Sequence, residues 1–299
     1  MTSLIDGNNK LSNNKWTGKK MRTETIDLYK YFNIERPEGA KANLTCYLIE
    51  KYEEFCPNRT RPAMLVIPGG GYEWICPREQ EPIALFYLSK GFQTFTLDYS
   101  ITKPVYYPYQ LIEGCMAMAY IRENAEKLLV DPEHVASIGF SAGGHLCGML
   151  ATLYKEKVVE EFLGERAKLC RPDAVVLSYP VISSSDCAHK GSIIILSGGN
   201  EELFEKISLE KQVDSSSSPA FIWTTANDGC VPADNSLLMA MAYKKAGVPF
   251  ELHVFENGSH GLSLCNSEIA LINIPTSAWV EMAVTFLRQR GFDVVDKWQ

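Results

Sequence analysis

One six-residue run constrains the fold of this 299-residue chain more than any other feature. It is Gly139-Phe140-Ser141-Ala142-Gly143-Gly144, which fits the pattern G-x-S-x-G. The residues before the run are apolar and predict a short buried strand, and residues 144–153 are small or apolar and predict a helix. A sharp turn between the two displays the serine outward with a strained backbone, and the flanking glycines let strand and helix approach without a clash. The pattern therefore predicts a strand–turn–helix unit, here called the elbow, that presents the hydroxyl of Ser141.

Strands and helices alternate along the rest of the chain. This alternation is typical of βαβ units, and it predicts the α/β class with a mainly parallel central sheet and helices on both of its faces. Ligands of such sheets bind outside the carboxyl ends of the strands. Strands are expected at 42–50, 61–68, 92–99, 135–138, 173–182, 220–225 and 250–255, and helices at 79–90, 109–129, 144–153, 235–246 and 276–288.

The length of the chain allows one large domain or two small ones. Residues 1–20 are polar and rich in Asn and Lys, and we expect a disordered tail there, followed by a single domain over 21–299. Residues 183–218 are less regular and contain four consecutive serines. We interpret them as an insertion over the carboxyl edge of the sheet near the active site, and a flexible linker between two domains is the alternative.

Charge and composition exclude several classes of function. The net charge is −7, and no basic patch is dense enough to follow a nucleic-acid backbone. No apolar stretch is long enough for a membrane span, and the first residues lack the apolar centre of a signal peptide, which favours a cytoplasmic location. The nine cysteines are scattered without C-x-x-C spacing. They indicate reduced thiols rather than disulfides or a metal site, and we expect no metal and no cofactor.

A serine hydroxyl is a poor nucleophile at neutral pH and needs a base within hydrogen-bond reach. Among the five histidines of the chain, His260 is the best candidate because it follows the last predicted strand, in a loop that contains Gly258 and Gly261. The other four lie before the elbow strand, in the elbow helix, in the irregular insertion and inside a strand: His134, His145, His189 and His253.

The base needs an orienting carboxylate. In proteins with this elbow the chain order is serine, acid, histidine, so the acid is expected between Ser141 and His260. Asp228 directly follows the predicted strand 220–225, and its carboxylate would hold the tautomer of His260 and stabilise the imidazolium. An aspartate before glycine is also common in turns. Asp214 and Asp186 are weaker rivals, since no clear strand precedes either.

The tetrahedral intermediate of acyl transfer needs N–H donors aimed at its oxyanion. One donor is expected to be the N–H of Ala142, directly after the serine. The others are expected from the glycine loop after the strand 61–68, with Gly70 and Gly71 as the main candidates. A glycine-rich loop can also bind phosphate, but no Lys-Ser or Lys-Thr follows as a P-loop requires.

Taken together, in order and spacing, these motifs resemble the acetyl-esterase branch of the α/β-hydrolases, related to hormone-sensitive-lipase-like esterases. Pro68 stands where the lipase-like branch has histidine, which favours the acetyl-xylan-esterase-like group. The resemblance implies an α/β-hydrolase fold, a Ser141–Asp228–His260 triad and no cofactor. It covers residues 42–292, and the segments that carry it are 67–72, 97–100, 139–146, 227–232 and 258–262.

The resemblance also implies a substrate, namely a carboxylic ester with a short acyl group such as acetyl. A xylo-oligosaccharide or another sugar would be the alcohol part, and residues 183–218 would help to wall the acyl pocket. Tyr72 and Trp74, beside the glycine loop, are candidates for stacking on a sugar ring, with packing as the alternative role. The partner is thus a small-molecule ester, not a nucleic acid or a membrane. A formamidase or small peptidase with the same triad is the alternative, and a non-catalytic binding protein is a remote one.

Overall fold

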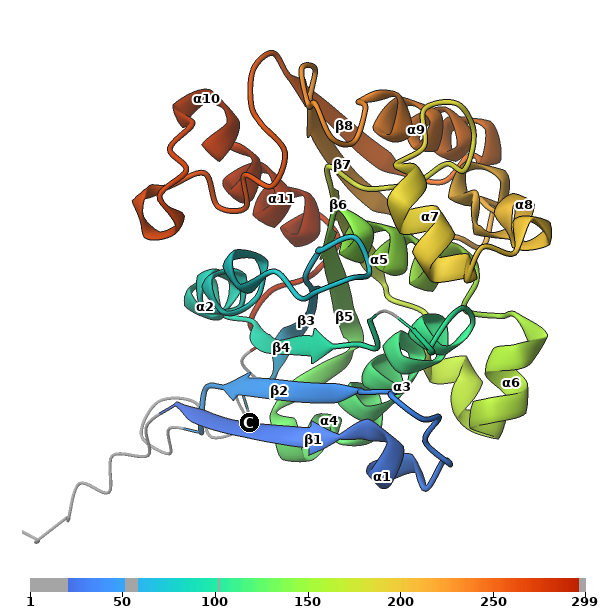
Figure 1. Cartoon of the computed structure of the whole chain (residues 1–299). Helices are drawn as coiled ribbons and strands as arrows, with labels where there is room; N and C mark the ends of the chain where they lie inside the picture. Colours follow the sequence, from blue (N-terminus) through green and yellow to red (C-terminus); the bar gives the residue numbers. More distant parts are fainter. Residues whose placement is uncertain (1–20, 52–58, 102, 296–299) are drawn as a thin grey trace, which may run out of the picture.

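The computed structural model describes residues 21–51, 59–101 and 103–295. An eight-stranded sheet runs through them in the order β1-β2-β4-β3-β5-β6-β7-β8 (Figure 1). The tail expected at 1–20 lies outside the described residues. The strands are β1 (Arg22–Asp27), β2 (Asn43–Leu48), β3 (Arg61–Ile67), β4 (Gln93–Asp98), β5 (Val130–Phe140), β6 (Ala174–Ser178), β7 (Ala220–Thr225) and β8 (Phe250–Phe255).

Every neighbouring pair of strands from β4 to β8 is parallel, whereas β2 pairs antiparallel with both β1 and β4. The prediction of an α/β class with a mainly parallel sheet is confirmed. Because parallel neighbours all end at the same side, the carboxyl ends of β3, β5, β6, β7 and β8 form one edge of the sheet. The amino ends of the same strands form the opposite edge.

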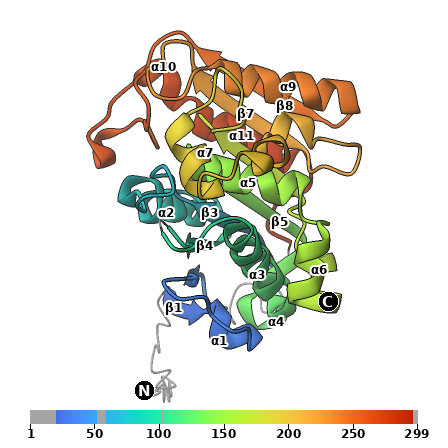
Figure 2. The ribbon, with the colours of Figure 1, turned by 45° about the vertical axis from the view of Figure 1, so that its right-hand side comes forward.

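Helices cover both faces of this sheet (Figures 1 and 2). On one face α2 and α11 pack against the apolar side chains of the strands, and on the other face α3, α5 and α9 do so. The helices are α1 (Leu28–Phe32), α2 (Glu81–Ser89), α3 (Tyr109–Glu123), α4 (Ala125–Leu128), α5 (Ala142–Thr152), α6 (Lys157–Leu163), α7 (Lys190–Ser197), α8 (Phe204–Ile207), α9 (Asp234–Ala246), α10 (Ile274–Ser277) and α11 (Trp279–Arg288). Short 3₁₀ turns lie at Pro77–Glu79, Gly164–Leu169, Glu201–Leu203, Leu209–Lys211 and Ser267–Ile269.

The long helix expected at 109–129 differs from its prediction in two ways. It divides at Asn124 into α3 and α4, and α3 is buried on all sides from Gln110 to Ile121 instead of on one face. The reason is its environment, because α3 packs against α1, α5 and α6 as well as the sheet. The elements β1, α1 and α6 were not predicted at all.

Residues 183–218 form a helical segment between β6 and β7. It packs tightly on α5: a Cβ placed on Gly148 would come within 2.6 Å of Cδ1 of Leu209. Figure 2 shows α7 beside α5, near the end of the sheet where the loops after the parallel strands gather. The segment therefore stands close to the elbow.

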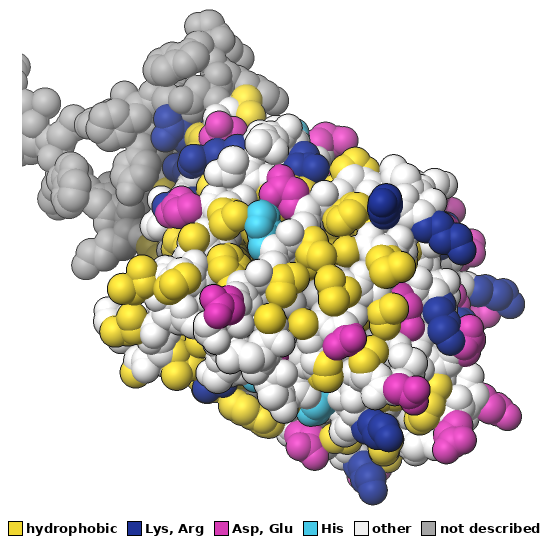
Figure 3. Space-filling model, turned by 90° about the horizontal axis from the view of Figure 1, so that it is seen from above, with side chains coloured by type: hydrophobic (Ala, Val, Ile, Leu, Met, Phe, Trp, Pro, Cys, Tyr) yellow, Lys and Arg dark blue, Asp and Glu magenta, His cyan; other side chains and the backbone are white. Residues whose placement is uncertain are grey.

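The surface of the described residues carries mixed charge. Seen from above, Lys and Arg side chains are interspersed with Asp and Glu and with small hydrophobic groups (Figure 3). Within the described residues no helix is both long and apolar enough to cross a lipid bilayer. The eight cysteines in this part of the chain are free thiols, and six of them are buried.

Candidate active site

The predicted elbow is present in the structure. β5 ends at Phe140, α5 begins at Ala142, and Ser141 between them has φ 54° and ψ −119°. Such a sparsely populated backbone conformation costs roughly 1–3 kcal/mol and persists only where the surroundings enforce it. Glycines make the turn possible, since a Cβ on Gly139 would lie 2.1 Å from the carbonyl oxygen of Gly143. The surrounding loops leave only 8% of Ser141 exposed.

Three side chains from three loops meet at the carboxyl edge of the sheet. Nε2 of His260, in the loop after β8, lies 2.8 Å from Oγ of Ser141. Nδ1 of the same ring lies 2.7 Å from Oδ2 of Asp228, in the loop after β7. The structure thus brings together the serine, the histidine and the acid that the sequence indicated.

The second oxygen of Asp228 is also fully engaged. Oδ1 accepts hydrogen bonds from the backbone N–H groups of Cys230 at 2.9 Å and Val231 at 3.0 Å. Burial raises the pKa of Asp228, but the hydrogen bond and charge of His260 together with these N–H groups outweigh it and lower the pKa overall. An ionised Asp228 accepts the Nδ1 proton of His260, which leaves Nε2 free to accept a proton from Ser141.

The two rival acids lie elsewhere. Asp214 is bound to Lys155 at 2.5 Å and to the hydroxyl of Ser216 at 2.6 Å, and Asp186 is exposed. No hydrogen bond or ion pair joins either carboxylate to a histidine within the described residues. Asp228 is the acid that the geometry favours.

Three backbone N–H groups beside the serine have no acceptor within the described part of the protein. They belong to Gly70, Gly71 and Ala142, the residues expected to form an oxyanion hole. Gly70 and Gly71 have φ of 126° and 66°, so glycine is needed for this loop conformation. The loop presses on the elbow, because a Cβ on Gly69 would lie 3.0 Å from Cβ of Ser141.

A buried network that the sequence did not indicate ties the glycine loop to the histidine loop. The carboxylate of Glu79 accepts from the N–H of Gly69 at 2.9 Å and from the hydroxyl of Tyr179 at 2.7 Å. The Tyr179 oxygen in turn accepts from the N–H of Ser263 at 3.0 Å, and its ring lies edge-on to His260. A buried glutamate after a turn carries no sequence signal of its own, since burial depends on the packing of distant segments.

The structure corrects the expectation for Tyr72. Its side chain is fully buried and its hydroxyl donates to Nδ1 of His145 at 2.9 Å, so it has no face for a sugar ring. His145 donates from Nε2 to the carbonyl of Ile207 at 2.8 Å, and burial lowers its pKa to about 4. Tyr72 and His145 therefore brace the glycine loop against α5 and α8. Trp74 is 49% exposed beside that loop and remains a candidate.

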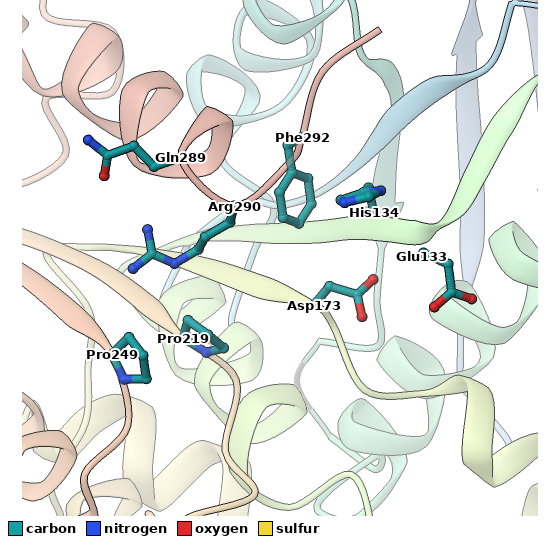
Figure 4. Close-up of a pocket in the computed structure, with 8 residues that line it drawn as sticks. All are labelled: Glu133, His134, Asp173, Pro219, Pro249, Gln289, Arg290 and Phe292. Atoms are coloured by element: carbon teal, nitrogen blue, oxygen red, sulfur yellow. The ribbon is translucent and has the colours of Figure 1, made fainter. Parts of the chain in front are cut away.

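A hollow lies at the opposite edge of the sheet from Ser141 (Figure 4). Its volume is about 530 Å³, and its lining residues come from the amino end of β5, from just before β6, β7 and β8, and from the end of α11 and beyond. They are Glu133, His134, Asp173, Pro219, Pro249, Gln289, Arg290 and Phe292, and none of them is a serine, threonine or cysteine.

Known proteins share this fold and much of this sequence. An endo-1,4-beta-xylanase B of Butyrivibrio fibrisolvens is 39% identical over 243 residues, which are 79% of this chain and 37% of that protein. An acetylxylan esterase of Xylanibacter ruminicola is 28% identical over 247 residues, which are 78% of this chain and 46% of that protein. This chain therefore spans less than half the length of these two curated relatives.

A solved structure matches the chain over a greater share of its length. The acetyl ester-xyloside bifunctional hydrolase from Caldicellulosiruptor lactoaceticus is 34% identical and has a TM-score of 0.78. The match covers 93% of this chain and 100% of that one. The BD-FAE family model matches residues 52–243, more than half of the chain. The chain therefore belongs to the BD-FAE family, in the acetyl-xylan-esterase-like branch of the α/β-hydrolases.

Proposed function

We propose that this chain is a serine carboxylesterase that removes short acyl groups, above all acetyl, from esters of sugars such as xylo-oligosaccharides. The observation that carries the proposal is the hydrogen-bond chain from Ser141 through His260 to Asp228, beside three unpaired N–H groups. The names of two relatives, an acetylxylan esterase and an acetyl ester-xyloside hydrolase, support the choice of acyl group and of alcohol.

The first half of the reaction forms an acyl-enzyme. Nε2 of His260 takes the proton of Ser141 while Oγ attacks the carbonyl carbon of the ester. The oxyanion accepts hydrogen bonds from the backbone of Gly70, Gly71 and Ala142, and Asp228 stabilises the imidazolium. His260 then gives the proton to the leaving alkoxide, so that the alcohol departs neutral and the acetyl group stays on Ser141.

The second half releases the acid. His260 accepts a proton from a water molecule, whose oxygen attacks the acyl carbonyl carbon. The same N–H groups hold the second oxyanion. When that intermediate collapses, the bond between the carbonyl carbon and Oγ breaks, and Oγ of Ser141 recovers its proton from His260. Acetic acid leaves, and the site returns to its starting state.

The carboxylates at the site support ester chemistry over glycosidic chemistry. Glycosidases need two carboxyl groups that flank the scissile bond. Asp228 and Glu79 are buried, and each is held by two or more hydrogen bonds within the protein. Neither is free to approach a sugar ring, so the xylanase name of one relative is not carried over to this chain.

Acetate release from acetylated xylo-oligosaccharides tests the proposal, with an aryl acetate measured alongside and Ser141→Ala as the blank. We expect release from both esters and none in the variant. Aryl octanoate should be a poorer substrate than aryl acetate. Release from the aryl ester alone would remove the sugar from the proposal. Faster turnover of N-formyl or aminoacyl amides than of acetate esters would replace the esterase with a formamidase or peptidase.

A further inference from the structure

His189 precedes α7, and its hydrogen bonds determine which ring nitrogen carries the proton. Nδ1 accepts a hydrogen bond from the backbone N–H of Ser192 at 3.3 Å and lies 2.8 Å from the Ser192 hydroxyl. A backbone N–H can only donate, so Nδ1 is the unprotonated nitrogen of the neutral ring. Nε2 therefore carries the hydrogen, and the described residues offer it no acceptor.

This donor lies beside the candidate active site. A Cβ on Gly71 would come within 3.9 Å of Oγ of Ser192, so the first turn of α7 adjoins the glycine loop. Burial lowers the pKa of His189, and the charge of His260 lowers it further, against smaller opposing effects of Asp228 and Glu73. His189 is thus uncharged at neutral pH and lies within electrostatic reach of the triad.

A groove is lined in part by residues of the same helix. Its volume is about 500 Å³, within the range of ~300–1,000 Å³ typical of small-ligand sites. Glu73, from the glycine loop, and Ile194, from α7, line it together with Lys103 and Tyr106. The Tyr106 ring packs on Gly198, where a Cβ would lie 3.0 Å from it.

The chemistry of this groove suits a polyhydroxylated chain. A carboxylate, an ammonium and a phenol can each hydrogen-bond to hydroxyls, while the tyrosine ring and the half-exposed Ile194 offer apolar surface to C–H groups. An acetyl group has two carbons and needs little room, so a groove of this size fits the alcohol part of the ester. His189 caps α7, whose later residues line the groove, and Glu73 of the groove lies within electrostatic reach of the His189 ring.

We propose that His189 is a specificity residue that donates from Nε2 to a hydroxyl or ring oxygen of the sugar next to the scissile ester, and so directs the rest of the saccharide into the groove along α7. The inference rests on the proposed function, because it assumes an ester whose alcohol is a sugar. It assigns a role to a histidine that the triad does not use.

Two substitutions separate this role from that of a helix cap. His189→Asn places an oxygen where Nδ1 accepts from Ser192, so it keeps the cap of α7 but loses the Nε2 donor. His189→Gln places an amide N–H near the position of Nε2 but gives up the cap. The matched control is His253→Asn, on β8, where the ring packs on Phe221 away from the site.

The measured quantity is the ratio of kcat/KM for an acetylated xylo-oligosaccharide to kcat/KM for an aryl acetate. His189→Asn should lower this ratio about tenfold, mainly through a higher KM for the sugar ester, as expected for one lost neutral hydrogen bond. His189→Gln should keep the ratio within about threefold of wild type, and His253→Asn should leave it unchanged. An unchanged ratio in His189→Asn, or a larger fall in His189→Gln than in His189→Asn, would overturn the inference.

A binding measurement keeps the inference separate from the proposed function. Unacetylated xylotetraose is titrated calorimetrically into the Ser141→Ala protein, with and without His189→Asn. Binding that weakens about tenfold with the second substitution supports the role of His189. Equal affinity in both proteins, or no binding to a protein whose wild type cleaves aryl acetate, overturns the inference and leaves the esterase standing. No reaction of wild-type Ser141 with a fluorophosphonate would instead overturn the proposed function.

Discussion

The two edges of the sheet each hold a histidine bonded to an aspartate and differ in what surrounds the pair. At the amino edge Nδ1 of His134 lies 3.0 Å from Asp131, and at the carboxyl edge Nδ1 of His260 lies 2.7 Å from Asp228. Nε2 of His134 faces the backbone at Gly291, whereas Nε2 of His260 faces the Ser141 hydroxyl. The hollow of about 530 Å³ belongs to the amino edge. A histidine–carboxylate pair and a cavity together therefore do not make this kind of site.

The direction of the backbone explains the difference. In a parallel sheet with crossover helices, helices begin at the carboxyl edge and end at the amino edge, so unpaired N–H groups gather at the first and carbonyls at the second. The N–H of Ala142 at the start of α5 is one such group. At the amino edge, Arg290 uses its guanidinium to bond the carbonyl of Phe286 near the end of α11. Unpaired backbone N–H groups that can receive an oxyanion therefore lie at the carboxyl edge of the described sheet.

The largest expected effect comes from the nucleophile. Ser141→Ala should lower kcat for aryl acetate by at least ~10⁴-fold while the fold remains intact, because the acyl-enzyme can no longer form. Steady-state kinetics measures the loss of kcat, and circular dichroism checks that the fold is intact. Turnover near that of wild type would show that the nucleophile lies elsewhere.

Matched substitutions at the two edges test whether the aspartate pairs are equivalent. Asp228→Asn should lower kcat by ~10³–10⁴-fold, since the amide no longer favours the reactive tautomer of His260. Asp131→Asn, which breaks the same kind of pair at His134, should change kcat less than twofold. Comparable losses in both variants would contradict the distinction between the edges, and a loss in Asp214→Asn alone would identify a different acid.

A second matched pair compares the buried carboxylate of Glu79 with the partly buried carboxylate of Asp173. Glu79→Gln should lower kcat about tenfold or more, because one carbonyl oxygen cannot accept from both Gly69 and Tyr179. Asp173 at the amino edge also accepts a backbone N–H, from Val135, and binds Arg122. Asp173→Asn should destabilise the fold without lowering kcat at 25 °C. Thermal unfolding and kcat are measured on both variants. A fall in kcat for Asp173→Asn as large as that for Glu79→Gln would contradict the distinction.

The smallest effect concerns the pH dependence of stability. The pKa of buried His145 is lowered from 6.5 to about 4, so the folded state binds fewer protons than the unfolded state between these values. The free energy of unfolding therefore falls as the pH drops from about 6.5 to about 4, by about 3 kcal/mol from this group. Urea unfolding at pH 7 and pH 4.5 should show a smaller difference in His145→Gln than in wild type. An equal difference would mean that His145 is not the group responsible.

The parts of this molecule that could be predicted are those with local signals. Glycines mark the turns at Ser141 and around His260, and the predicted strand 220–225 places Asp228 directly after a strand. The alternation of strands and helices brings these three loops to one edge of the sheet. Glu79 and the burial of Tyr72 could not be predicted, because they depend on contacts between segments far apart in the sequence. The same reason explains why the burial of α3 on all sides was not predicted. That burial requires packing against α1 and α6, and the hydrophobic patterns of these two short helices are too weak to predict them.

The hydrogen bond between Glu79 and Tyr179 determines when the loops of the site become ordered. A flexible glycine loop and a histidine loop would each lose conformational entropy whenever a substrate had to align them. Because Gly69 and Ser263 are both tied to this one buried connection, that entropy is lost once, as the chain folds, and not again in each turnover. The glycine loop and the histidine loop are thus preorganised in the folded protein before a substrate binds.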